Sequence, residues 1–120
     1  MPDHKHILIV EDEKPLAHAL QLKLEHDGYK VSVASNGQEC LDAVATGEFD
    51  VVLLDLMMPI MDGFQVLQQL QAKPKRPSVI VLSNLSQRED EQRVLALGAK
   101  KYFIKSDTAL SVIIDEIKKA

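Results

Sequence analysis

Acidic residues directly follow apolar runs at two points of the chain. Glu11 and Asp12 follow ILIV (residues 7–10), and Asp55 follows VVLL (residues 51–54). A buried charge is costly unless something pairs with it, and two like unit charges about 5 Å apart repel by roughly 3 kcal/mol at an effective dielectric constant near 20. A hard divalent cation relieves such repulsion, and carboxylates without His or Cys favour magnesium or manganese over zinc.

Two other polar residues stand at the ends of apolar runs. Ser83 ends SVIVLS (residues 78–83), and Lys105 follows KKYFI (residues 100–104). A magnesium ion that is held by one or two carboxylates keeps coordination positions open for phosphate oxygens. Phosphoryl transfer needs positioning and charge neutralisation more than covalent help, and a metal and a lysine provide both. These residue types therefore favour phosphoryl chemistry.

Strand-like and helix-like sequence patterns alternate along the chain, and the elements that they predict would position these residues. Short β-branched or aliphatic runs predict strands at residues 6–10, 29–34, 51–55, 78–83 and 100–104. Helical patterns lie at residues 14–26, 38–46, 64–71, 87–97 and 108–119. Five such units in a row predict an α/β fold with a parallel sheet and helices on both faces. Ligands bind beyond the carboxyl ends of strands in such sheets, where the polar residues fall.

Local signals mark the helix ends. Pro15 suits the first turn of its helix, Asn36-Gly37 opens the next, and Asp62-Gly63 reads as turn and cap chemistry rather than as a ligand. Ser86 and Glu89 have the spacing of a capping box.

The segment QREDEQR (residues 87–93) has no apolar anchor for two turns, although Glu89 and Arg93 can pair at i, i+4. It is either a solvated helix face or a weakly docked segment that shifts when Ser83 is pulled towards a phosphoryl group.

Bulk properties exclude several classes of protein. The 120 residues carry a formal charge of −4, which gives no support to nucleic-acid binding. No apolar run approaches the roughly 20 residues that span a bilayer, and the single Cys40 excludes an intramolecular disulfide framework. We expect one domain, residues 1–120, in the cytoplasm and without direct contact to nucleic acid or membrane.

Four stretches together resemble the receiver domain of bacterial two-component response regulators. They are ILIVEDE, VVLLDLMMPIMDG, VIVLSN and GAKKYFIKS, in this order and each at the end of a predicted strand. The resemblance implies a flavodoxin-like (βα)5 three-layer sandwich with strand order 2-1-3-4-5. It also implies a phosphorylation-dependent signalling switch that promotes its own phosphorylation and dephosphorylation but turns over no separate substrate.

The resemblance assigns a role to each site residue. Asp55 would accept a phosphoryl group from a phosphohistidine of a partner kinase. Asp12, Asp55 and the backbone carbonyl of Met57 would bind magnesium directly, and Glu11 would bind it through water.

Further roles follow from the same resemblance. Lys105 would pair with Asp55 and then with the phosphoryl oxygens, Ser83 would donate its hydroxyl to the phosphoryl group, and Tyr102 would swing inward after Ser83. The outward faces of the last two helices and the last strand would form the output surface. The implied partners are a sensor histidine kinase or phosphotransfer protein, an output domain or effector, and a second copy in a phosphorylation-dependent homodimer.

One position departs from the family pattern, and two other functions compete. Receivers usually have Pro after the lysine, commonly in a cis peptide, whereas this chain has Ser106. We predict a trans Lys105–Ser106 bond and a reshaped loop, because a cis bond without Pro costs about 2.5–4 kcal/mol.

One alternative to the phosphorylation-dependent switch is a phosphorylation-independent interaction module with a relic site. Another is a phosphatase of the haloacid dehalogenase type, which is disfavoured because Met57 stands where its second acid is needed.

Overall fold

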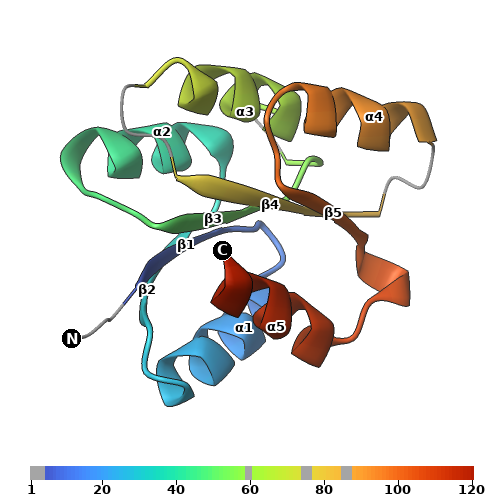
Figure 1. Ribbon diagram of the computed structural model, residues 1–120. Coiled ribbons are helices and arrows are strands. Elements are labelled where there is room, and N and C mark those ends of the chain that lie inside the picture. Colours follow the sequence, from blue (N-terminus) through green and yellow to red (C-terminus); the bar gives the residue numbers. More distant parts are fainter. Residues whose placement is uncertain (1–4, 59–60, 74–76, 85–87) are drawn as a thin grey trace.

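Strands and helices alternate along the chain in the computed structural model, which describes residues 5–58, 61–73, 77–84 and 88–120 (Figure 1). The strands are β1 (His6–Val10), β2 (Lys30–Ala34), β3 (Val51–Leu54), β4 (Ser78–Ser83) and β5 (Lys101–Ile104). The helices are α1 (Lys14–His26), α2 (Gly37–Thr46), α3 (Gly63–Gln71), α4 (Arg88–Ala96) and α5 (Leu110–Lys119), with a short 3-10 helix at Lys105–Asp107. The predicted elements are all present, and most of their ends agree within one residue.

The strands form one parallel sheet in the order β2-β1-β3-β4-β5, as predicted. Val10 at the end of β1 lies opposite Leu54 at the end of β3, and Ser83 at the end of β4 lies opposite Ile104 at the end of β5. The register therefore brings the residues after these strands to one edge of the sheet.

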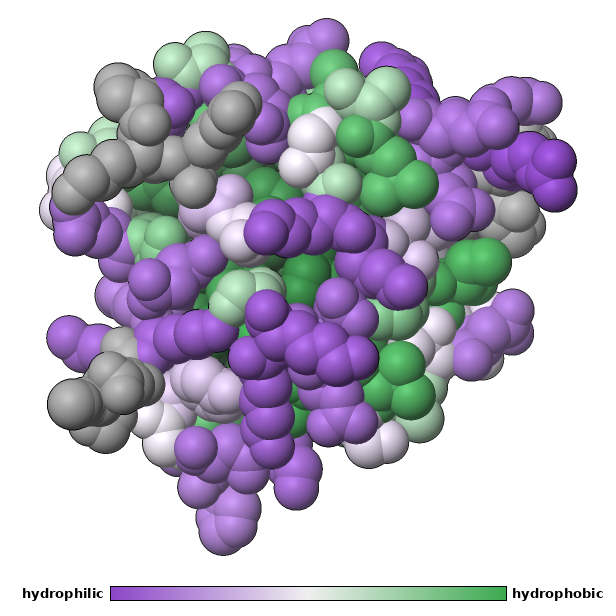
Figure 2. Space-filling model, viewed as in Figure 1, coloured by the Kyte–Doolittle hydropathy of each residue, from purple (hydrophilic) through white to green (hydrophobic). Residues whose placement is uncertain are grey.

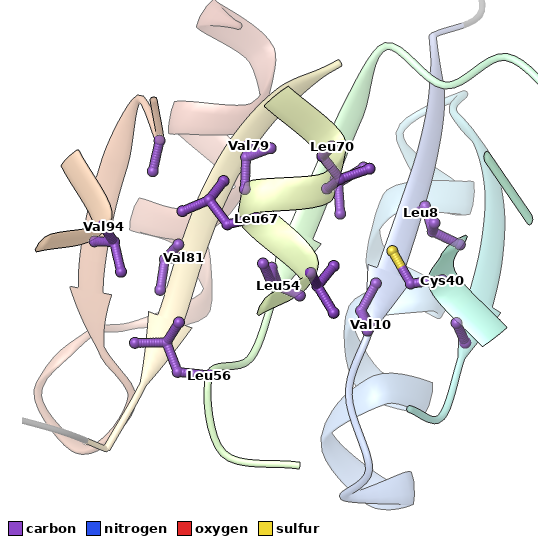
Figure 3. Close-up of a cluster of buried hydrophobic side chains, with 14 residues drawn as sticks. Leu8, Val10, Cys40, Leu54, Leu56, Leu67, Leu70, Val79, Val81 and Val94 are labelled. Carbon is purple, nitrogen blue, oxygen red and sulfur yellow. The ribbon is translucent and has the colours of Figure 1, made fainter. Parts of the chain in front are cut away.

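Helices cover both faces of the sheet. In Figure 1, α2, α3 and α4 lie on one face and α1 and α5 on the other. The first face buries a cluster that includes Leu8, Val10, Cys40, Leu54, Leu56, Leu67, Leu70, Val79, Val81 and Val94, and Figure 3 shows these side chains between the helices and the sheet. The second face buries Ile7, Ile9, Ala17, Leu20, Leu24, Val51, Leu53, Ile80, Leu82, Ile113, Ile114 and Ile117. β1, β3 and β4 contribute to both clusters, which explains their continuous apolar sequences.

Side-chain caps begin α3, where the sequence predicted one, and α2, where the sequence predicted a turn. The Asp62 carboxylate accepts a hydrogen bond from the Gln65 amide at 3.0 Å, and the Gln65 side chain accepts one from the Asp62 amide, which completes a capping box. Asn36 caps α2 by accepting from the Glu39 amide at 2.9 Å. The capping box predicted at Ser86 lies outside the described residues.

The last helix begins later than the predicted residue 108, because the loop after β5 forms a short turn. None of the described peptide bonds is cis, so Lys105–Ser106 is trans as predicted. The chain forms a 3-10 turn at Lys105–Asp107, and the Thr108 hydroxyl donates to the Ile104 carbonyl at 2.8 Å. α5 therefore begins at Leu110, two residues later than its pattern suggested.

The surface is mainly polar on the face shown in Figure 2, where hydrophobic residues form small patches among hydrophilic ones. Across the described part of the chain, no helix combines the length and apolarity that a membrane span requires.

Gly63 lies where α3 packs on the end of β3, and a side chain there has no room. A Cβ atom would lie 2.7 Å from the Asp55 carbonyl oxygen and 2.6 Å from the Leu56 Cα. We expect Gly63→Ala to lower the unfolding free energy in urea by about 1–3 kcal/mol, because the contacted atoms are backbone. Gly47→Ala is the matched control, since its Cβ would meet no atom closer than 3.5 Å; equal stability of the two variants would contradict the prediction.

Candidate functional site

Three carboxylates meet at the carboxyl edge of the sheet. One carboxylate oxygen from each of Glu11, Asp12 and Asp55 lies within 4.8 Å of the others. Glu11 and Asp55 are each only 3% exposed, whereas Asp12 is exposed. The group combines hard oxygen ligands with one open side, which fits a magnesium or manganese ion. The sequence predicted all three residues, and β1 and β3 bring them together because they are neighbours in the sheet.

The ammonium group of Lys105, the first residue after β5, joins this cluster. Its Nζ lies 2.9 Å from Glu11 Oε1, 3.0 Å from Asp55 Oδ2 and 2.7 Å from Glu13 Oε2. The predicted contact with Asp55 is therefore present. With Asp12 counted, four carboxylates face one ammonium, so the site is strongly negative without a metal.

Asp55 is held at both carboxylate oxygens. Oδ1 accepts a hydrogen bond from the Met57 amide at 3.1 Å, and Oδ2 accepts one from Lys105. The Asp55 amide donates to the Val10 carbonyl at 3.0 Å, which extends the β1–β3 ladder by one residue. These bonds hold the carboxylate in one position at the end of a buried strand.

Glu13 is a site residue that the sequence analysis missed. It precedes the first residue of α1 and makes no side-chain cap bond, so its carboxylate reaches Lys105 instead. Its amide donates to Glu11 Oε2 at 3.0 Å. The run of three acids at residues 11–13 was the available signal, but the position of Lys105 relative to that run depends on the fold.

Burial sets the protonation behaviour of the site. It raises the pKa of Glu11 to about 7, although the hydrogen bond from Lys105 opposes this shift. Burial also raises the pKa of Asp55, again against the hydrogen bond from Lys105. For Lys105 burial acts in the opposite direction, but hydrogen bonds to the three carboxylates outweigh it and raise its pKa. The lysine therefore stays charged, whereas burial makes the two buried carboxylates easier to protonate than exposed ones.

Ser83 and Tyr102 form a second, adjoining pair. Ser83 is fully buried at the end of β4, and Tyr102 lies half-buried on the neighbouring β5. Burial raises the pKa of the Tyr102 hydroxyl, the charges of Asp90 and Glu91 on α4 add to this, and a hydrogen bond with Ser83 opposes it. The predicted pair is thus in contact, and Tyr102 also lies near the acidic residues of α4.

A comparison with known families identifies the chain. The family model described as the response regulator receiver domain matches residues 7–117. The chain belongs to the response regulator receiver family. Receiver domains are signalling modules of two-component systems, and the acidic group of Glu11, Asp12 and Asp55 fits a metal site in such a domain.

Solved receiver domains have the same fold. The receiver domain of the Francisella response regulator 1452 superposes with a TM-score of 0.91 at 29% identity, over 97% of this chain and 95% of that chain. The response regulator TrrA from Thermotoga maritima, in complex with Mg(2+)-BeF, superposes with a TM-score of 0.83 at 31% identity, over 96% of this chain and 97% of that one.

Curated relatives are longer than this receiver. The uncharacterized transcriptional regulatory protein YkoG of Bacillus subtilis is 44% identical over 100 residues, which are 83% of this chain and 44% of that protein. The transcriptional regulatory protein PcoR of Escherichia coli is 36% identical over 99 residues, which are 82% and 44% of the two chains. The receiver thus spans less than half the length of these relatives.

The raised pKa of Glu11 predicts a pH dependence of stability in the metal-free chain. Between pH 4.5 and about 7, folded Glu11 keeps a proton that the unfolded chain releases. The unfolding free energy should therefore fall as pH rises through this window, and Asp55 adds to the fall. Urea unfolding with a chelator present measures it.

The variant Glu11→Gln should flatten this slope because its side chain cannot titrate. Glu25→Gln removes an exposed carboxylate of α1 and should keep the slope that Glu11 produces. An unaltered slope in Glu11→Gln would contradict the assignment of the titration to Glu11.

Proposed function

We propose that Asp55 is the phosphoryl acceptor of this receiver and that its phosphorylation switches the domain. The observation that carries the proposal is the position of Asp55: it is buried, bonded to Lys105, and within 4.8 Å of two further carboxylates. Several carboxylates beside a single ammonium leave negative charge that a bound metal ion would offset, so a metal-assisted phosphoryl acceptor explains the arrangement better than a structural role.

The proposed step exchanges one bond to phosphorus for another. A carboxylate oxygen of Asp55 attacks the phosphoryl group, and the bond between phosphorus and a histidine nitrogen of the kinase breaks with its electron pair returning to the imidazole. The product is an acyl phosphate, which water can later hydrolyse. A reversible signal needs such a labile product.

The surrounding residues supply charge neutralisation. Asp12, Asp55 and the Met57 carbonyl would hold magnesium directly, and Glu11 would hold it through water. The bound ion would neutralise charge on the phosphoryl oxygens. The Lys105 ammonium would turn from the carboxylates to the same oxygens, and Ser83 would donate its hydroxyl to them.

The switch would continue from Ser83 to Tyr102. The Ser83 hydroxyl bonds to Tyr102 in the structure, so a Ser83 that turns to a phosphoryl oxygen would release the tyrosine. Tyr102 would then move inward, and the outward surface of α4, β5 and α5 would change.

Membership of the family supports a histidine kinase or phosphotransfer protein as the donor and an output domain or effector as the receiver of the signal. The names of YkoG and PcoR support an output in transcription, which another domain or protein would carry out. The domain extent of residues 1–120, the cytoplasmic location and a phosphorylation-dependent homodimer stay predictions.

The first test is formation of the adduct. With magnesium and acetyl phosphate, the chain should gain one phosphoryl group by mass spectrometry, and Asp55→Asn should abolish it because the amide is not a nucleophile. Asp42→Asn, an exposed change on α2, is the control and should react like the unaltered chain. An unreactive chain would favour the phosphorylation-independent interaction module, and a chain that reacts equally without Asp55 would overturn Asp55 as the acceptor.

The second test concerns the metal ligands. Magnesium should raise the thermal unfolding temperature by binding the folded state, and Asp12→Asn should weaken its affinity by at least about tenfold because a direct ligand loses its charge. Asp115→Asn on α5 serves as the control for charge alone. Equal magnesium affinities in the two variants would argue against a direct role of Asp12.

A further inference from the structure

Helix α4 has little apolar anchoring at its start. Val94 is its buried residue among residues 88–96, whereas the two turns before Val94 carry only polar side chains. The i, i+4 pairing of Glu89 with Arg93 that the sequence allowed is not among the ion pairs of the described residues. Another contact must therefore hold these turns against the domain.

Arg93 makes that contact with α3. Its guanidinium carbon lies 3.9 Å from the centroid of the Phe64 ring, and Figure 1 shows α3 and α4 side by side on the same face of the sheet. Phe64 is half-buried and packs against the core cluster of that face. A cation over an aromatic face within about 6 Å is attracted to it, so Arg93 ties the polar turns of α4 to a firmly packed ring.

Phe64 is itself tied to the segment that carries Asp55. The preceding Gly63 donates its amide to the Leu56 carbonyl at 2.9 Å. Gly63 also packs so closely that a Cβ atom would lie 2.7 Å from the Asp55 carbonyl oxygen. A shift of the backbone at residues 55–56 would therefore reach the Phe64 ring through one peptide link.

Helix α4 also interacts with Tyr102 of β5. Tyr102 bonds to Ser83 and lies close enough to Asp90 and Glu91 for their charges to affect its hydroxyl. Helix α4 is thus linked to the Phe64 ring through Arg93 in its last turn, and the acids of its first turn act on Tyr102 through their charge. Phe64 and Tyr102 both connect to the carboxyl edge of the sheet, one through α3 and the other through β4.

We propose that the contact between Arg93 and Phe64 is a clamp that holds α4 in its unphosphorylated position and opens when the domain switches. The inference rests on the proposed function, because it concerns the equilibrium that phosphorylation of Asp55 would shift. A contact that stabilises only the resting state opposes any ligand that binds the switched state. Removal of the clamp therefore strengthens the binding of such a ligand.

Beryllofluoride with magnesium is the probe, titrated into the full chain and followed by nuclear magnetic resonance of α4 amides. Arg93→Gln and Phe64→Leu should each lower the dissociation constant about two- to fivefold, the range expected for loss of one exposed cation–π contact. The double variant should equal either single one, since both remove the same contact. The dissociation constant of Arg93→Lys should lie between those of Arg93→Gln and the unaltered chain, because lysine keeps a cation near the ring.

Arg88→Gln is the matched control. It removes the same charge from the same helix at an exposed position, and its dissociation constant should equal that of the unaltered chain. Arg93 is exposed as well, so Arg93→Gln keeps the test valid even where Phe64→Leu lowers stability.

Unchanged or weaker binding in Arg93→Gln would overturn the clamp, as would additive effects in the double variant or a tightening of equal size in Arg88→Gln. Failure of the proposed function looks different: the unaltered chain itself would not bind beryllofluoride, or would bind it equally with Asp55→Asn, and this would overturn the clamp as well.

Discussion

The structure depends on the balance of charge around one ammonium group. Lys105 lies within hydrogen-bond distance of Glu11, Glu13 and Asp55, two of which are almost completely buried. Buried carboxylates at such separations would repel and would be costly to desolvate without a cation. The lysine offsets part of this cost. The remaining negative charge makes the site suited to a metal ion, and a bound metal ion would in turn balance the charge of a phosphoryl group.

This balance requires side chains from distant parts of the chain to stay in place. Parallel strands with continuous apolar sequences provide the rigidity, because β1 and β3 are buried on both faces. Their register places Val10 beside Leu54, so the acids that follow them meet at one edge. A packed interior resists small displacements, and the carboxylates therefore remain close despite their repulsion.

Rigidity is not uniform over the domain. Helix α5 buries three isoleucines, whereas α4 buries only Val94 among its described residues. The other interactions of α4 are the contact of Arg93 with Phe64 and the effect of its acidic residues on Tyr102. Elements with few buried apolar contacts are those that open or shift at least cost. The uneven anchoring is the physical basis of the response that we propose for α4.

The sequence by itself determined the alternation of strands and helices, the parallel sheet and the residues at its carboxyl edge. These features depend on local periodicity and on strand ends, which neighbouring residues define, and the family resemblance supplied the strand order. It also determined the trans bond at Ser106, because the cost of a cis bond is a property of the residue type. The cap at Asp62 and the helix start at Asn36-Gly37 were equally local.

Only the tertiary structure decided which side chains meet across long separations. Glu13 reaches Lys105 across 92 positions of the chain, and no local pattern distinguishes it from an ordinary acid before a helix. Arg93 likewise lies over Phe64 instead of pairing with Glu89. Both pairings follow from the positions of α1, α3 and α4 on the sheet. A long charged side chain pairs with the partner that the packed elements bring within its reach.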